Sequence, residues 1–332
     1  MKNITALAFL VIINCVYIFI NPIFSQETGN NRYAFSVSPQ IGIVYGQALE
    51  YVYPVKTKAE LYSELRWDMK PVFYAGLQLD YGPSDIMRSI DFFSSLSFKA
   101  GFPKDSGVME DRDWQSEENS ALTNFSSHTN RTNSFFALNA AVGISLPVKS
   151  IICIKPFIGG SWMHFSFTGR DGYKNYAVKK TSNPDTFFPI EDNPDYEVFD
   201  GVVINYKQDW LLIAAGFEIE TNVLYPFTVN ASFQVSPFTY CNALDEHINP
   251  RTKISTFYND ITSMGLFFEP KINFALNINR IAFSFDVAYR RIGNTKGESY
   301  KKENKNYKVI DEEAGAGLSL LDTRFLVKIN LF

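Results

Sequence analysis

Two short acidic strings in this sequence place ionisable side chains two residues apart. Asp111 and Asp113 belong to the string MEDRDW, and Asp245 and His247 to the string LDEHIN. Residues at i and i+2 of an extended segment point to the same side. Two carboxyl groups held close together can share one proton, and a carboxylate beside an imidazole makes it a better general base. Each pair taken alone is also compatible with a solvated acidic turn or a surface ion pair.

The composition of the chain excludes several classes of protein. The 332 residues carry a formal net charge of −4, which does not suit a nucleic-acid binder held by phosphate contacts. Three Cys are too few for a disulfide scaffold, and together with only three His they leave little material for a soft-metal site. We therefore expect neither a metal nor a cofactor. Aromatic residues make up 16% of the chain, and strands favour such side chains. The composition therefore favours β structure.

The first residues have the pattern of a secretory signal peptide. Lys2 precedes an apolar run over residues 4–20, and the small residue Ser25 is followed by a polar stretch. The alternative is an uncleaved anchor, but a membrane-spanning helix needs roughly 20 apolar residues and this run is shorter. We therefore expect a signal peptide at residues 1–25 and one exported domain at residues 26–332.

The exported domain alternates between apolar and polar or small residues with a period of two. In residues 281–289 every odd position is large and apolar, and every even position is small or polar. This period predicts strands with one apolar face, which meets either a second sheet or, in a closed barrel, the lipid. We expect about ten strands, at residues 32–54, 58–81, 89–103, 131–147, 151–168, 201–220, 223–241, 257–278, 280–293 and 314–332.

The predicted connections between these strands differ in length. Short turns at one end and long loops at the other are typical of bacterial outer-membrane barrels. We therefore expect an all-β fold, a transmembrane antiparallel β-barrel with long extracellular loops. The predicted tight turns lie near residues 55–57, 148–150, 221–222 and 279, and the predicted long polar loops at residues 104–130, 169–200, 242–256 and 294–313.

The two acidic strings, in an exported barrel of ten strands, resemble the omptin family of outer-membrane proteases. The family has a Met-x-Asp-x-Asp-Trp string in one outer loop and an Asp-Glu-His string in a later one. Shorter similarities follow in the family's order and cover essentially the whole exported domain. They are IG at 41–42, EYVY at 50–53, FSFTGR at 165–170, NYKQ at 205–208, NTKG at 294–297 and GAG at 315–317.

The resemblance implies which residues carry out the reaction. The family's catalytic groups fall on Asp111, Asp113, Asp245 and His247, with an activated water between the two pairs. His247 takes the proton of the water, and Asp245 orients the imidazole ring. Asp111 and Asp113 hold the water and share a proton. This mechanism of an aspartic-type endopeptidase needs no metal, no cofactor and no covalent intermediate.

The resemblance also implies a substrate site that includes Glu50, Met109 and His128. The family binds a basic side chain between two acids, of which Glu50 matches one, whereas Ala243 stands in place of the other. Asn124 replaces a further acid of the family beyond the scissile bond. We therefore expect cleavage next to basic residues with relaxed specificity.

A lipopolysaccharide site is not recognisable in the sequence. The basic and polar residues with which family members hold lipopolysaccharide phosphates are replaced here by Gly160, Trp162, His164 and Asp209. A dependence of activity on lipopolysaccharide is therefore left open.

These observations predict a monomeric endopeptidase in the bacterial outer membrane, in contact with membrane lipid and with its active site facing outside. Its partners are peptide or protein substrates, and no nucleic acid is expected. Two alternatives stay open. A catalytically weak barrel of the same shape could act as an adhesin or a host-protein receptor, and a passive porin would need a charged lumen without a groove of paired acids.

Overall fold

The computed structural model describes residues 33–54, 59–83, 90–149, 151–181, 183–190, 193, 196–249, 252–303 and 306–331. The predicted signal peptide at residues 1–25 lies outside these ranges. In the described ranges no helix is both long enough and apolar enough to span a membrane.

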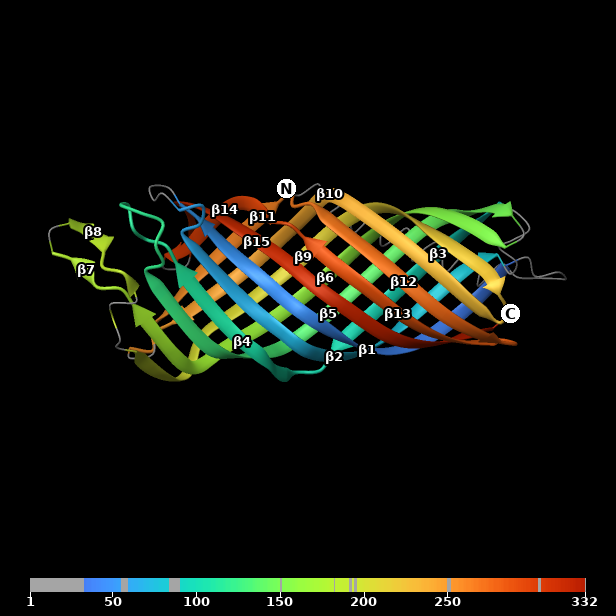
Figure 1. Cartoon of the computed structure of the whole chain (residues 1–332), viewed down its shortest axis with the longest axis horizontal. Helices are drawn as coiled ribbons and strands as arrows, with labels where there is room; N and C mark the ends of the chain where they lie inside the picture. The colour runs from blue at the N-terminus through green and yellow to red at the C-terminus, as the bar shows by residue number, and fades with distance from the viewer. Residues whose placement is uncertain are drawn as a thin grey trace.

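The strands form one antiparallel sheet that closes on itself (Figure 1). β1 pairs with β2 on one side and with β15 on the other, which completes the ring. A short separate hairpin, made of β7 (Lys179–Lys180) and β8 (Asn183–Phe187), projects at the left end of Figure 1. The strands of the ring are β1 (Tyr33–Tyr53), β2 (Ser63–Pro83), β3 (Asp91–Gly101), β4 (Lys104–Asp113), β5 (Asn124–Lys149), β6 (Ile152–Tyr176), β9 (Glu197–Leu224), β10 (Phe227–Ile248), β11 (Ser255–Ser263), β12 (Phe267–Ile278), β13 (Ile281–Ile292), β14 (Lys296–Glu303) and β15 (Asn306–Asn330).

Three positions of the ring are each shared by two strands that follow one another in the sequence. β3 and β4 both pair with β2 and β5, β11 and β12 both pair with β10, and β13 and β14 both pair with β15. Pro103 separates β3 from β4, and proline has no N–H to donate to a ladder. Met264, between β11 and β12, has a φ of +65°. The 13 strands of the sheet thus occupy ten positions, which confirms the predicted ten-stranded barrel.

The barrel wall has an apolar zone and a polar zone along its axis. Around β12, β13 and the end of β15, large apolar side chains such as Phe274, Phe285 and Phe325 are exposed on the wall. Lipid accepts such side chains, whereas water does not, so this apolar zone is the membrane-spanning part. The polar zone, toward the left of Figure 1, contains β4, β11, β14 and the adjoining parts of the longer strands.

Most of the polar zone is strand where the sequence predicts long loops. β4 lies wholly within the predicted loop 104–130, and β14 lies wholly within the predicted loop 294–313. β5, β6, β9, β10 and β15 also extend into predicted loops. The alternation that predicts strands depends on one apolar face. It fades here because neither face of these strand parts meets lipid. The two acidic strings are consequently held on strands.

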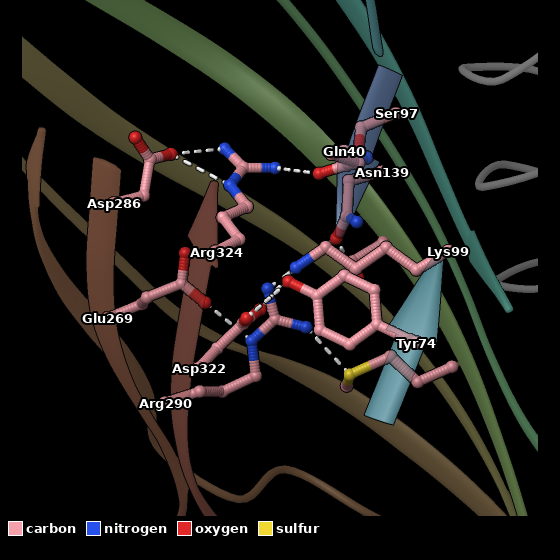
Figure 2. Close-up of polar contacts among 12 residues, drawn as sticks. Gln40, Tyr74, Ser97, Lys99, Asn139, Glu269, Asp286, Arg290, Asp322 and Arg324 are labelled. Carbon is pink, nitrogen blue, oxygen red and sulfur yellow. Dashed lines mark hydrogen bonds and ion pairs between the residues drawn. The ribbon is translucent and has the colours of Figure 1, made fainter. Parts of the chain in front are cut away.

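Charged side chains line the lumen of the apolar zone and form a network of ion pairs and hydrogen bonds, the lumenal network (Figure 2). Lys99 of β3 forms an ion pair with Asp322 of β15, and the Tyr74 hydroxyl donates to the same aspartate at 2.6 Å. Arg324 pairs with Asp286 at 2.6 Å. Each of these buried charges thus faces a charge of opposite sign, as burial in a protein interior requires.

Other contacts of this lumenal network cross from one wall to another. Arg290 of β13 pairs with Glu269 of β12 at 2.5 Å. The same guanidinium reaches the Met163 sulfur of β6 at 2.7 Å and Asn139 Oδ1 of β5 at 3.5 Å. A charged lumen is also what the porin alternative requires, so that alternative depends on whether the polar zone holds a groove of paired acids.

An aromatic core lies between the lumenal network and the outer rim of the polar zone. The Trp67 ring stacks between those of Phe167 and Tyr206, with ring centroids 5.5 and 5.2 Å apart. All three rings are fully buried inside the barrel. This packing fixes β2, β6 and β9, which support the strands that carry the acidic strings.

Candidate active site

The two acidic strings lie on separate strands of the polar zone. Asp111 and Asp113 belong to β4, which pairs with β2 and β5. Asp245 and His247 belong to β10, where it runs between β9 and β11. Asp245 is buried, so this side of β10 faces the inside of the barrel, and the residue two positions later shares that face.

Polar neighbours fix the Asp111–Asp113 couple. The Ser63 hydroxyl donates to Asp111 Oδ1 at 3.4 Å, and the Asn124 amide donates to Asp113 Oδ2 at 2.9 Å. Gln115 donates to the same oxygen of Asp113 at 3.2 Å. Burial raises the pKa of Asp111, and the charge of Asp113 raises it further; burial also raises the pKa of Asp113. Raised pKa values let the couple keep one shared proton.

Asp245 orients the imidazole of His247. The distance from His247 Nε2 to Asp245 Oδ2 is 2.5 Å, and the carboxylate side chain is only 3% exposed, whereas the imidazole is 45% exposed. Desolvation lowers the pKa of His247, but the charge and the hydrogen bond of Asp245 outweigh it. The charges of Asp111 and Asp113 act in the same direction, and the pKa of His247 rises to about 9. Because Asp245 engages Nε2, Nδ1 is the ring nitrogen left for a further partner.

The Asp111–Asp113 couple and the Asp245–His247 pair, here called the dyad, shift each other's pKa values. His247 lowers the pKa values of Asp111 and Asp113, although burial outweighs this effect, and both carboxylates raise the pKa of His247. Charges act over short distances in salt solution, so the fold has brought the two strings together. In the part of the chain that the structure describes, no group of three or more His, Cys, Asp or Glu side chains is arranged to hold a metal ion.

Comparison with known proteins identifies the family. Residues 31–328 match the model of the omptin family. This chain belongs to the omptin family. It is 26% identical over 253 residues to the plasminogen activator of Yersinia pestis, across 71% of this chain and 72% of that protein. The crystal structure of the outer membrane protease OmpT from Escherichia coli superposes with a TM-score of 0.77 at 18% identity, covering 92% of this chain and 99% of OmpT.

These findings confirm the resemblance predicted from the sequence. The chain is an outer-membrane β-barrel of a family whose members are proteases. The two acidic strings that carried the resemblance lie within the matched residues.

The three predicted substrate residues of this omptin have different surroundings. Glu50 of β1 is buried on the inside of the barrel, and burial together with the charges of Asp245 and Asp260 raises its pKa. Met109 is 2% exposed and belongs to the aromatic core. His128 is 4% exposed, and its Nε2 lies 3.0 Å from Ser126 Oγ. Contact of all three residues with a substrate stays a prediction.

The structure adds residues to the site that the sequence does not single out in these roles. Asn124 and Ser63 bind the couple directly, as described above. Burial and the charges of Asp111 and Asp113 raise the pKa of Tyr176, which places this phenol near the couple. Ser63 and Tyr176 belong to no recognisable string, and only the strand pairing brings them to the site.

Two of the positions that the resemblance assigns to lipopolysaccharide binding carry a His–Asp pair in this omptin. His164 Nδ1 lies 2.9 Å from Asp209 Oδ1, and the ring of Trp162 stacks on the imidazole at 6.3 Å between centroids. The neighbours Met163 and Trp210 are buried inside, so this pair faces the outer wall. A role of this pair in lipid binding stays a prediction.

Proposed function

We propose that this omptin is an endopeptidase that hydrolyses peptide bonds of peptides or proteins at the bacterial surface. The observation that carries the proposal is that the Asp245–His247 dyad and the Asp111–Asp113 couple shift each other's pKa values. Together they offer a base, a carboxylate that orients it, and a pair of acids that share a proton. Such a set supports direct attack by water on a carbonyl carbon.

In the proposed mechanism His247 Nδ1 accepts a proton from a water molecule as its oxygen attacks the scissile carbonyl carbon. Asp245 keeps the ring in place through Nε2 and stabilises the imidazolium. The Asp111–Asp113 couple holds the water from the other side. The imidazolium then returns its proton to the amide nitrogen as the C–N bond breaks, so water is added across the peptide bond. No bond between enzyme and substrate forms.

We propose that the barrel works as a monomer in the outer membrane, with the polar zone outside the cell. The apolar zone supports contact with lipid, and the long polar strands continue beyond it on one side only. The same orientation exposes the dyad and the couple to extracellular peptides. The His164–Asp209 pair offers lipopolysaccharide phosphates less positive charge than a group of arginines and lysines.

The proposed specificity is for a basic residue next to the scissile bond. Glu50 supplies a buried carboxylate on the inner face, and a basic side chain is its natural partner. Beyond the bond, Asn124 is neutral and its amide is engaged by Asp113. We therefore propose that neutral residues are tolerated on that side.

Cleavage of a diverse peptide library by the refolded protein in detergent tests this function. We expect cuts next to arginine or lysine on one side, with little selection on the other, and no inhibition by metal chelators or thiol reagents. Mass spectrometry of the products identifies the residues on both sides of each cleaved bond. Binding of peptides without any cleavage, both with and without added lipopolysaccharide, would favour the adhesin or receptor alternative. Loss of activity with a zinc chelator would contradict the proposed mechanism.

The raised pKa of His247 predicts an unusual pH profile. A general base must be neutral, and the imidazole loses its proton only as the pH rises toward about 9. We expect kcat/KM for a short peptide to keep rising from pH 6 up to about pH 9. With an ordinary histidine of pKa about 6.5, kcat/KM would level off well before pH 9. An NMR titration of the His247 ring protons should give the same midpoint. A plateau reached by pH 7 would show that the surrounding carboxylates do not stabilise the imidazolium.

A further inference from the structure

Asp260 of β11 is a buried acid beside the position where this omptin lacks an acid of its family. In the β10–β11 ladder Asp260 is the direct partner of Ala243. Residues directly opposite in an antiparallel pair have their Cβ atoms about 5 Å apart and point to the same face. Both side chains are buried, with exposed fractions of 5% and 2%. Compared with the family's acid at the position of Ala243, this carboxyl group therefore lies one strand further around the ring, on the same inner face.

The position of Asp260 on β11 is closer to Glu50 than position 243 on β10 is. β1, which carries Glu50, is followed around the ring by β15, β14, β11 and β10. Asp260 on β11 is therefore one strand closer to β1 than Ala243 on β10. The charge of Asp260 raises the pKa of Glu50, after burial and the charge of Asp245, so the two carboxyl groups lie near each other. Ala243 has a side chain too small to stand between them.

Three carboxyl groups of this inner face each have a buried oxygen that lacks a partner. Glu50 Oε2, Asp245 Oδ1 and Asp260 Oδ1 accept no hydrogen bond from any residue that the structure describes. Within that part of the chain, no lysine or arginine forms an ion pair with Glu50 or Asp260. Buried carboxylate oxygens need donors, and leaving them unsatisfied destabilises the ionised form of the acids. A cation with several N–H groups could donate to all three oxygens.

We propose that Asp260 replaces the missing second acid and, with Glu50, forms the site for an arginine side chain before the scissile bond. This inference rests on the proposed peptidase function and deepens it. A guanidinium group presents five N–H donors in one plane, so it can satisfy oxygens from two strands at once. The position before the bond is then selective for arginine, and only the position beyond it, near Asn124, is relaxed.

Burial and the charge of Asp245 also raise the pKa of Asp260, to about 7, against the effect of a hydrogen bond from Ser299. A crowded set of acids of this kind binds a cation more readily than it holds several negative charges. Bound arginine would favour the ionised form of both Glu50 and Asp260.

Kinetics with matched peptides test the role of Asp260. The peptides carry arginine or its neutral analogue citrulline before the scissile bond and are otherwise identical. In the unmodified protein we expect kcat/KM to favour arginine strongly. In Asp260→Asn we expect this ratio to fall by at least about 30-fold, the lower end for removal of one partner of a buried charge pair, while citrulline cleavage changes little.

Two further variants distinguish a direct contact of Asp260 with the arginine side chain from a general effect of negative charge near the site. Glu298→Gln removes an exposed acid of the neighbouring strand β14 and should leave the ratio unchanged. Ala243→Asp should restore the preference for arginine in the Asp260→Asn background, but should add little to the unmodified protein. An unchanged ratio in Asp260→Asn, or a large gain from Ala243→Asp alone, would overturn the proposal.

Binding measurements keep this test independent of catalysis. In the His247→Ala background the arginine peptide should bind without being cleaved, and Asp260→Asn should weaken this binding by a similar factor. If the unmodified protein cleaves no peptide but binding depends on Asp260, only the peptidase function fails. If peptides are cleaved but neither measurement depends on Asp260, only the present inference fails.

Discussion

Replacement of His247 by alanine should lower kcat/KM for a cleaved peptide by about 10²–10⁴-fold, the usual contribution of a general base. The variant loses the nitrogen proposed to take the proton of the attacking water. Asp111→Asn should lower activity to a comparable extent, because the couple then has a single carboxyl group left to share the proton. Initial rates at several peptide concentrations measure both effects.

His164→Ala is the matched control for these variants. His164 is also paired with an aspartate, but it lies on the outer wall, away from the dyad. We expect it to retain peptide cleavage in detergent. Circular dichroism and the electrophoretic shift of folded barrels on heating should show that all three variants fold. Full activity of folded His247→Ala would exclude the proposed base.

A second large effect, on the free energy of unfolding, is expected when an ion pair of the lumenal network in Figure 2 is broken. Asp322→Asn removes the negative charge that faces Lys99, whose side chain is only 8% exposed. Breaking one side of a buried ion pair leaves an uncompensated charge, and we expect the free energy of unfolding to fall by about 3 kcal/mol. Urea unfolding in lipid vesicles measures this change.

The double variant Lys99→Met/Asp322→Asn should recover most of the lost stability, because no unpaired charge remains at that position. The exposed pair of Lys308 and Glu303 gives the comparison at the surface, with side chains 68% and 53% exposed. Glu303→Gln should leave the unfolding midpoint unchanged, since water screens both charges. Equal midpoints for Asp322→Asn and the unmodified protein would show that the lumen is as well solvated as the surface.

The sequence by itself determined the architecture of the apolar zone. Its period-two alternation follows directly from a wall that meets lipid on one face and a packed lumen on the other. The spacing of Asp111 with Asp113 and of Asp245 with His247 likewise predicts two pairs that share a strand face, because this depends only on local backbone geometry. The collinear short strings were sufficient to indicate the family.

The extent of the strands was not predictable in the polar zone. β4 and β14 carry no alternation of apolar and polar residues, so the sequence shows them as loops. Their strand structure depends on hydrogen bonds to neighbours that are distant in the chain, such as the pairing of β14 with β11. Pairings of this kind are set by the closure of the whole barrel.

Only the tertiary structure decided which side chains share the inner face of the polar zone. The sequence shows Ala243 as the loss of an acid, whereas the ladder places Asp260 directly beside it. The sequence also shows Asn124 only as the loss of an acid, whereas the fold makes it a donor to Asp113. Both facts depend on strand register, which no local pattern encodes, because a shift of a single residue turns every side chain of a strand to the opposite face.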